Sequence, residues 1–181
     1  GSLMPLIPGK HTATEDKDAV NYEVEKVVCN MNADRWESLP LPIVVDSGAS
    51  ESVMPESWCE HVKTLETAKS RNKEFYTAAN GHRIYNKGEH YVAMMTKEGY
   101  RRNMKFQVCD VTRPLAPVSK ICEAGHSVIF NPSWDGRGSY ILNHETGEKL
   151  WMTQKDGVFV LETKVAPTEW QMKPGFARQG R

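Results

Sequence analysis

The stretch Leu41-Pro-Ile-Val-Val-Asp-Ser-Gly-Ala-Ser50 decides how the rest of this sequence is interpreted. Its apolar residues, Ile43 to Val45, predict a buried strand. The strand leads directly into Asp46, which is followed by a small hydroxyl residue and a glycine. A carboxylate at the end of an apolar strand is costly to bury unless it is paired, hydrogen-bonded or protonated. An acid at this position therefore indicates chemistry.

The Asp46-Ser47-Gly48 tripeptide has three other interpretations. It is also ordinary turn chemistry, and this alternative stays open. A phosphorylation-dependent degradation motif has the same form with a later serine, but Ser52 is one residue off that spacing. Such motifs are also exposed and flexible, whereas this one is joined to an apolar strand. A serine hydrolase elbow would need a glycine where Ser52 stands, so that interpretation fails.

A second informative stretch runs from Phe75 to Tyr85. Its Asn80-Gly81 pair is the strongest short hairpin signal, with both turn residues expected at positive φ. Aromatic and β-branched residues on both sides supply the two strands. We expect a hairpin here, either a plain one or one that closes over a substrate.

Apolar runs, some of them alternating, predict most of the remaining structure as β. Further strands are expected at 22–28, 52–54, 91–96, 100–108, 127–130, 139–142, 149–153 and 158–165. In the 100–108 strand, Met104, Phe106 and Val108 should point into the core. Lys105 and Gln107 should point outward.

Two short helices are predicted between these strands. The first begins after Pro55, because Trp58, Val62 and Leu65 then fall on one helical face. The second spans 118–124 and ends at Gly125, a favourable C-terminal cap.

The connecting segments are polar. The loop 30–42 is expected to cover Met31 and Trp36, and the charged run 66–74 to be a solvated connection. Residues 1–20 are expected to form a flexible leader and 166–181 a tail or linker.

Composition bounds the class of protein. The chain has 181 residues, of which 39% are apolar and 25% charged, so one domain with a core is expected. Its formal net charge is zero, which argues against nucleic-acid or bilayer partners held by charge. No apolar run approaches the ~20 residues of a membrane span, and no signal peptide is predicted.

The four cysteines, Cys29, Cys59, Cys109 and Cys122, are widely scattered. Their spacing does not suggest a structural zinc site, and buried thiols in a reducing compartment are expected. A cysteine protease would need a thiolate beside a histidine. Cys59 and His61 are close in sequence, but sequence proximity does not establish that geometry.

Several motifs, in the same order, resemble the protease segment of copia-type retroelement Gag-Pol polyproteins. The first is the apolar-apolar-Asp-Ser-Gly-Ala loop that resembles the active-site loop of aspartic proteases. The others are the hairpin turn at 79–81, the segment 110–121, the Gly-x-Ser-Val-x-Phe stretch at 125–130, and the turns and strands at 146–149 and 157–161. The resemblance covers about residues 22 to 165.

This resemblance implies an all-β, retropepsin-like acid-protease barrel that is completed by homodimerisation, with one or two short helices. It assigns 21–125 to the protease core and 126–165 to additional C-terminal strands that pack on or extend it. An intracellular location is implied, in the cytoplasm or a retroelement particle.

The implied activity is aspartic endopeptidase cleavage of a Gag-Pol polyprotein. Asp46 from each of two chains would form the catalytic dyad, with Ser47, Gly48 and Ala49 completing the active-site loop. The residues expected to contact the peptide substrate are Ser50, Glu51, Ala79, Asn80, Gly81 and His82. No metal or organic cofactor, nucleic acid or membrane is implied.

Two departures from the family pattern stand out. Retroviral proteases carry Ile/Leu-Leu-Gly-Arg before the terminal helix, whereas this chain has Leu115-Ala-Pro-Val118. The usual Asp-Asp or Asp-Asn after the catalytic loop is replaced by Ser50 and Glu51. Two alternatives therefore remain: a catalytically silent dimeric module that binds an extended peptide, and a structural spacer of the polyprotein.

Overall fold

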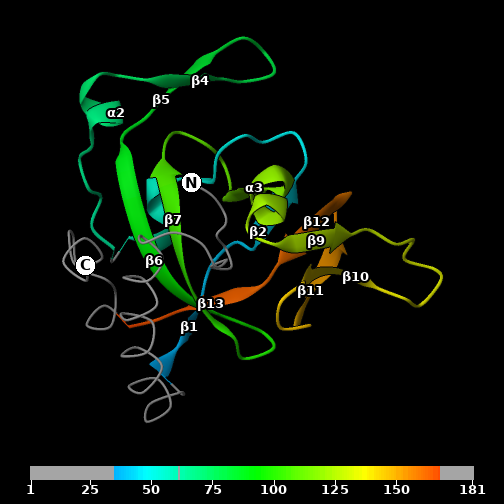
Figure 1. Ribbon diagram of the computed structural model, residues 1–181. Coiled ribbons are helices and arrows are strands. Elements are labelled where there is room, and N and C mark those ends of the chain that lie inside the picture. The colour runs from blue at the N-terminus through cyan, green and yellow to red at the C-terminus, as the bar shows by residue number, and fades with distance from the viewer. Residues whose placement is uncertain (1–34, 61, 168–181) are drawn as a thin grey trace.

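The computed structural model of the chain describes residues 35–60 and 62–167. The predictions for the 1–20 leader, the 22–28 strand, Met31 and Cys29 lie outside these residues, as does most of the predicted tail. The described chain is mainly β, with a sheet that curls into a half-barrel and two short helices (Figure 1). None of the helices in the described ranges is long and apolar enough to cross a membrane.

Eleven strands form one sheet. In spatial order they are β1 (Glu37–Ser38), β13 (Thr163–Val165), β6 (Gly88–Thr96), β7 (Arg101–Val108), β3 (Val53–Met54), β8 (Leu115–Pro117), β2 (Ile43–Asp46), β12 (Val158–Leu161), β11 (Lys149–Lys155), β10 (Ser139–Asn143) and β9 (His126–Ile129). A separate two-stranded sheet pairs β4 (Phe75–Thr77) with β5 (Arg83–Tyr85). The helices are the 3₁₀ turn η2 (Glu56–Cys59), α2 (Ala68–Arg71) and α3 (Val118–Glu123).

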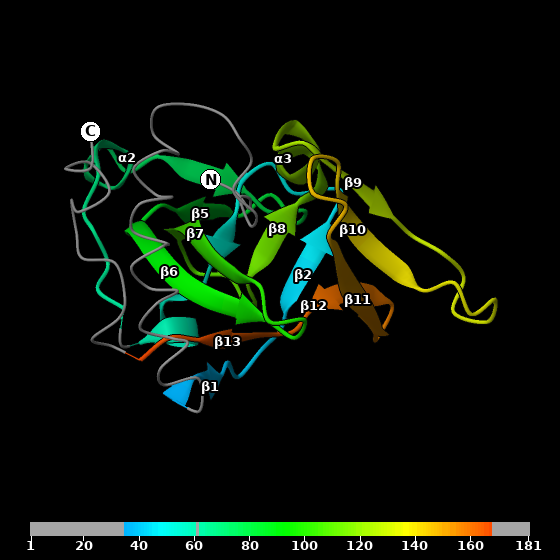
Figure 2. The same ribbon diagram turned by 60° about the horizontal axis from the view of Figure 1, so that its bottom comes forward.

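Strand β8 lies between β2 and β3, although β2 and β3 follow one another along the chain. It runs parallel to β2, with Asp46 opposite Pro117, and antiparallel to β3. Figure 2 shows β8 and β2 side by side near the middle of the sheet. The connection from β2 to β3, which carries the Asp-Ser-Gly sequence, therefore passes the end of β8 where α3 begins.

The C-terminal strands belong to the same sheet as the rest. The sequence predicts one strand at 158–165, but the chain divides at Glu162 into two strands with different neighbours. Strand β12 pairs with β2, and β13 pairs with β6. An ion pair of 2.7 Å between Arg102 Nη2 and Glu148 Oε2 adds a side-chain link between β7 and the β10–β11 turn.

Most of the core is one cluster of buried side chains, drawn from strands across this sheet. Phe106 is fully buried and meets Trp58 edge-on, with 5.2 Å between ring centroids. Met104 and Val108 are buried as predicted. The prediction that Gln107 points outward is wrong: only 1% of it is exposed. Both the oxygen and the nitrogen of its side-chain amide form hydrogen bonds, which offset the cost of burying a polar side chain.

The structure also corrects the predicted helices and loops before the hairpin. A single turn, η2, replaces the helix expected after Pro55, and Leu65 instead forms a β-bridge to Glu89. Trp58 and Val62 are still buried, so the apolar spacing reflected core contact and not a helix. The segment 66–74 contains α2, which a Thr67–Ser70 capping box starts.

Two other predictions about loops and helices are confirmed. Trp36 is buried, although the loop that carries it also contains the short strand β1. Helix α3 forms at the predicted place, and Gly125 follows it with φ +91°.

Gly88, where β6 begins, has no room for a side chain. Its φ is +135°, and an added Cβ would lie 2.3 Å from Leu65 O and 2.8 Å from Thr64 Cγ2. We expect Gly88→Ala to lower the free energy of unfolding by about 3 kcal/mol, because backbone strain adds to overpacking.

The matched control for that substitution is Gly99→Ala. Gly99 has φ +91° but nothing within 4 Å of an added Cβ, so only the backbone term, about 1 kcal/mol, remains. Denaturant unfolding of both variants measures the difference. Equal losses of stability would contradict the close approach of Leu65 to Gly88.

Candidate active site

Asp46 is the last residue of β2 and leaves the sheet at its end. The three residues before it are at most 6% exposed, and β8 and β12 pair with the strand along its two edges. The Asp46 side chain is itself half-buried, and Ser47 and Gly48 are exposed. The predicted buried strand with an acid at its end is thereby confirmed.

The loop turns back onto the Asp46 carboxylate. The backbone N–H of Gly48 donates to Asp46 Oδ1 at 2.7 Å. A Cβ added at Gly48 would lie 3.3 Å from the same oxygen, tighter than most such contacts. Glycine therefore lets the backbone close on the carboxylate, and one carboxylate oxygen is held while the loop stays open to solvent.

Glu51 ties this loop to two helices. Its carboxylate lies 3.2 Å from Lys120 Nζ in α3 and 3.6 Å from Lys69 Nζ in α2. Burial raises the pKa of the Glu51 carboxyl, while the nearby Lys120 and Lys69 ammonium groups lower it. The family resemblance implies that Glu51 contacts substrate, which stays a prediction. In this structure the carboxylate anchors the loop after Asp46.

The two lysines were not identified from the sequence. Lys120 lies in α3, directly after the segment where the pattern of retroviral proteases has an arginine and this chain has none. Lys69 lies in a helix that the sequence did not predict. Nothing in the sequence distinguishes these two lysines from other charged surface residues. Only the fold places them next to Glu51.

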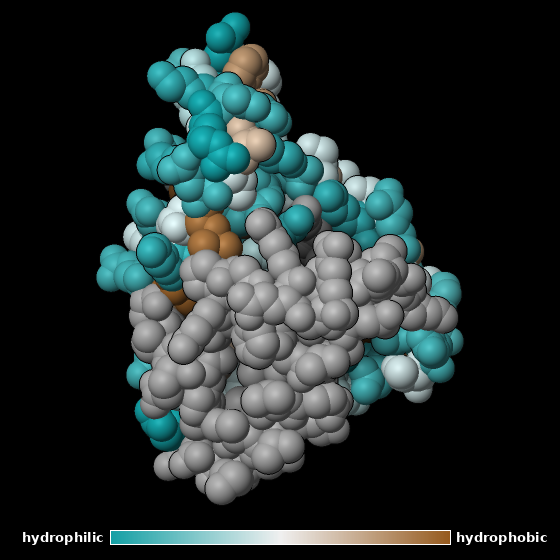
Figure 3. All heavy atoms as spheres, turned by 60° about the vertical axis from the view of Figure 1, so that its left-hand side comes forward, coloured by the Kyte–Doolittle hydropathy of each residue, from teal (hydrophilic) through white to brown (hydrophobic). Residues whose placement is uncertain are grey.

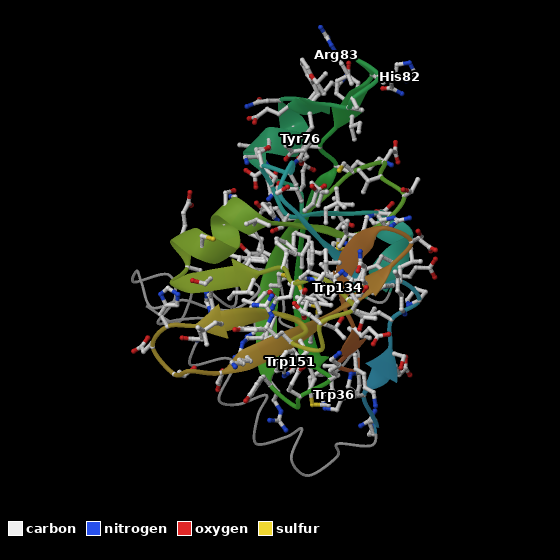
Figure 4. The ribbon with its side chains drawn as sticks, turned by 90° about the vertical axis from the view of Figure 1, so that its right-hand side faces the viewer. Trp36, Tyr76, His82, Arg83, Trp134 and Trp151 are labelled. Carbon is white, nitrogen blue, oxygen red and sulfur yellow. The ribbon has the colours of Figure 1, made fainter. Side chains whose placement is uncertain are left out.

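The residues of the predicted substrate-closing turn, Ala79 to His82, are all exposed. They connect β4 and β5 in a hairpin that stands out from the body, with a mostly hydrophilic surface (Figure 3). Figure 4 places His82 and Arg83 at its outer end. Figures 1 and 2 both show the hairpin at the end of the sheet where the Asp46 loop and α3 lie.

The turn itself differs from the predicted one. Only Gly81 has positive φ, +84°, so the expectation that Asn80 shares it is wrong. Gly81 N donates to Ala78 O and Ala78 N donates to His82 O, each at 2.9 Å. This pattern fits a longer turn that ends in a left-handed glycine, with Asn80 Oδ1 accepting from His82 N at 3.0 Å.

The structure does not join the two halves of the predicted site directly. Within residues 35–60 and 62–167, no hydrogen bond or ion pair links Ala79–His82 to Asp46–Glu51. Ser50 is exposed and Ala49 half-buried in the loop. The link between loop and hairpin is indirect and runs through Glu51 and Lys69 of α2, the helix just before β4.

Thiol chemistry is disfavoured at the described cysteines near the core. Cys59 and Cys109 are 1% exposed, and burial raises the pKa of each thiol to about 12. A thiolate nucleophile at Cys59 would need the opposite shift. Cys122 is exposed on α3. In the part of the chain that the structure describes, no group of three His, Cys, Asp or Glu side chains could hold a metal ion.

Comparison with known proteins adds no independent assignment. No family model, curated protein or solved structure matches this chain. What bears on function is therefore the set of sequence motifs and the geometry around Asp46.

Proposed function

We propose that this protein is an aspartic endopeptidase that cleaves peptide bonds in a retroelement Gag-Pol polyprotein and acts as a homodimer. The observation that carries the proposal is the position of Asp46. It ends a strand enclosed on both sides, and its carboxylate accepts a hydrogen bond from Gly48 N in an exposed Asp-Ser-Gly-Ala loop. A carboxylate fixed by backbone at the rim of a rigid sheet suits general acid–base chemistry.

A homodimer supplies the second carboxylate. The sequence contains one Asp-Ser-Gly, and peptide hydrolysis by this chemistry uses two carboxylates that share a proton. Two-fold symmetry brings the same loop from each chain to one axis. The exposed Ser47 hydroxyls would link the two loops. Because Gly48 has no side chain, the loop backbone can lie close to the Asp46 carboxylate and would leave room for the substrate.

The two carboxylates then have different roles in the reaction. One Asp46 carboxylate takes a proton from a water molecule, whose oxygen attacks the scissile carbonyl carbon. The protonated Asp46 of the other chain donates a hydrogen bond to the carbonyl oxygen and stabilises the developing charge. A proton then passes to the leaving amine, and the C–N bond breaks.

The surroundings of the loop support this assignment. Helix α3 directly follows β8, and Lys120 within it contacts Glu51, so the loop is braced although the glycine and arginine of the family pattern are absent. The hairpin stands at the same end of the sheet and would close over an extended peptide, excluding water. Residues Ser50 and Ala79 to His82 would line that peptide.

The proposal is tested by incubating the purified chain with a polypeptide that contains its flanking polyprotein sequence. We expect discrete cleavage products by mass spectrometry, and inhibition by a statine-type peptide whose hydroxyl replaces the attacking water. A dimer that binds the polypeptide without cutting it would instead favour the silent peptide-binding module. A monomer with neither property would favour the spacer.

The hairpin turn offers a separate prediction. Gly81 has φ +84° with nothing within 4 Å of an added Cβ, so Gly81→Val strains only the backbone. We expect turnover to fall at least about tenfold, because the turn would rearrange where substrate binds. The free energy of unfolding should fall by the backbone strain alone, at least the roughly 1 kcal/mol expected for Gly99→Ala.

Gly157→Val is the control for this change. Gly157 has φ +80° and equally open surroundings, in the β11–β12 turn. It should suffer the same backbone strain and keep its turnover. Normal cleavage by the Gly81 variant would show that the turn does not act on substrate.

A further inference from the structure

The hairpin β4–β5 is attached to the body at few points. Its two strands form a sheet of their own, separate from the eleven-stranded one. At its base, Asn86 N donates to Glu74 O at 2.8 Å. Among the residues that the structure describes, one side-chain hydrogen bond joins a hairpin strand to the body: Asn86 Nδ2 donates to the Tyr76 hydroxyl at 3.2 Å.

Asn86 is itself held rigidly by buried partners. Its Nδ2 also donates to Gln107 Oε1 at 2.7 Å, and its Oδ1 accepts from Gly88 N at 2.9 Å. Gln107 Nε2 donates in turn to Glu89 Oε2 at 2.9 Å. Asn86, Gln107 and Glu89 are 4%, 1% and 8% exposed. Even without Tyr76, both polar atoms of the Asn86 side chain have a hydrogen-bond partner. These bonds therefore fix the orientation of the Asn86 amide independently of Tyr76.

Tyr76 faces the body while its neighbours face solvent. Tyr76 and its cross-strand partner Ile84 are half-buried, whereas Phe75 and its partner Tyr85 are 43% and 47% exposed. Burial also raises the pKa of Tyr76 to about 12, so its hydroxyl stays neutral. Figure 4 shows Tyr76 at the base of the hairpin, with His82 and Arg83 at the far end. The Tyr76 contact is thus at one end of the hairpin and the exposed turn is at the other.

We propose that Tyr76 is a latch: its hydroxyl, held by the buried Asn86–Gln107–Glu89 network, keeps the base of the hairpin against the body, and loss of that bond releases it. Tyr76 is then a positioning residue for the turn 79–82, not a catalytic one. Its effect on cleavage rests on the proposed function, whereas the latch itself does not.

Hydrogen exchange of Tyr76→Phe tests the latch. An isolated two-stranded hairpin is marginally stable in water, so a released hairpin loses protection along its own ladder. We expect the amides of Ala78, Gly81 and Asn86 to exchange roughly three- to tenfold faster, the range that one hydrogen bond supports. Amides of β6 and β7 should keep their wild-type rates.

Tyr85→Phe is the matched control, since it removes the same atom from the exposed face of the same hairpin. Equal exchange rates in the two variants would overturn the latch. So would faster exchange spread evenly through β6 and β7, or loss of folding, because Tyr76 would then stabilise the whole body.

Kinetics of the active dimer provide a second, separate measurement. If the hairpin binds peptide in its latched position, Tyr76→Phe should raise KM by about the same factor as the exchange rates, with less change in kcat. A fall in kcat at constant KM would contradict the latch as a binding device. If the wild-type chain cleaves no peptide, the proposed function fails while the exchange experiment still decides on the latch.

Discussion

Asp46→Asn is expected to abolish peptide-bond cleavage, with a loss of at least about a thousandfold, because an amide can neither take the proton from water nor donate one in the same way. The fold should be almost unchanged. Asparagine has the same shape, and its Oδ1 can still accept the hydrogen bond from Gly48 N. Cleavage rates and thermal unfolding of the two proteins measure both parts of the expectation.

Asp156→Asn is the control for that substitution. Asp156 also precedes a glycine, but it lies in the exposed turn between β11 and β12 and has φ +49°, which asparagine tolerates well. The activity of the Asp156→Asn variant should equal that of the wild type. Unchanged proteolysis by the Asp46 variant would remove Asp46 from the mechanism, whatever its place in the fold.

The parts of the fold that the sequence predicts are those governed by local pattern. Strand β6 is largely apolar from Tyr91 to Met95, β7 alternates apolar and polar residues from Met104 to Val108, and both strands form close to the expected positions. Helix α3 carries its own termination signal at Gly125. None of these elements depends on a distant partner to be identified.

What the sequence does not predict depends on contacts between distant segments. Nothing local indicates that β8 inserts between β2 and β3, or that β12 becomes the other neighbour of β2. The alternation of its strand predicts that Gln107 points outward. In the structure its side chain is buried, where it forms hydrogen bonds with Glu89 of β6 and with Asn86, which lies just before β6. Tertiary hydrogen bonds overrode the binary pattern there.

The candidate site likewise combines features that local sequence signals predict with contacts that only the fold creates. The acid, the loop and the hairpin are sequence signals, because strand, turn and glycine chemistry are local. The ion pairs of Glu51 with Lys69 and Lys120, and the contact of Asn86 with Tyr76, are products of the fold. The sequence therefore identified the groups proposed for chemistry and missed those that hold them in place.

The second large effect is expected when wild-type chains are mixed with Asp46→Asn chains. If each active site takes one Asp46 from each of two chains, a mixed dimer has a single carboxylate and should be inactive. With random pairing and a ninefold excess of the variant, only about a tenth of wild-type chains find a wild-type partner. Activity per wild-type chain should thus fall roughly tenfold, whereas a ninefold excess of Asp156→Asn should not reduce it.

Dilution tests the same requirement without a variant. Specific activity should decline as the chain concentration falls below the dimer dissociation constant, because association of two chains creates the site. Light scattering at the same concentrations should show the dimer disappearing in parallel. Activity that is proportional to concentration and indifferent to excess Asp46→Asn would mean that one chain is sufficient. The exposed Asp-Ser-Gly loop would then have to find its second carboxylate within its own chain or work without one.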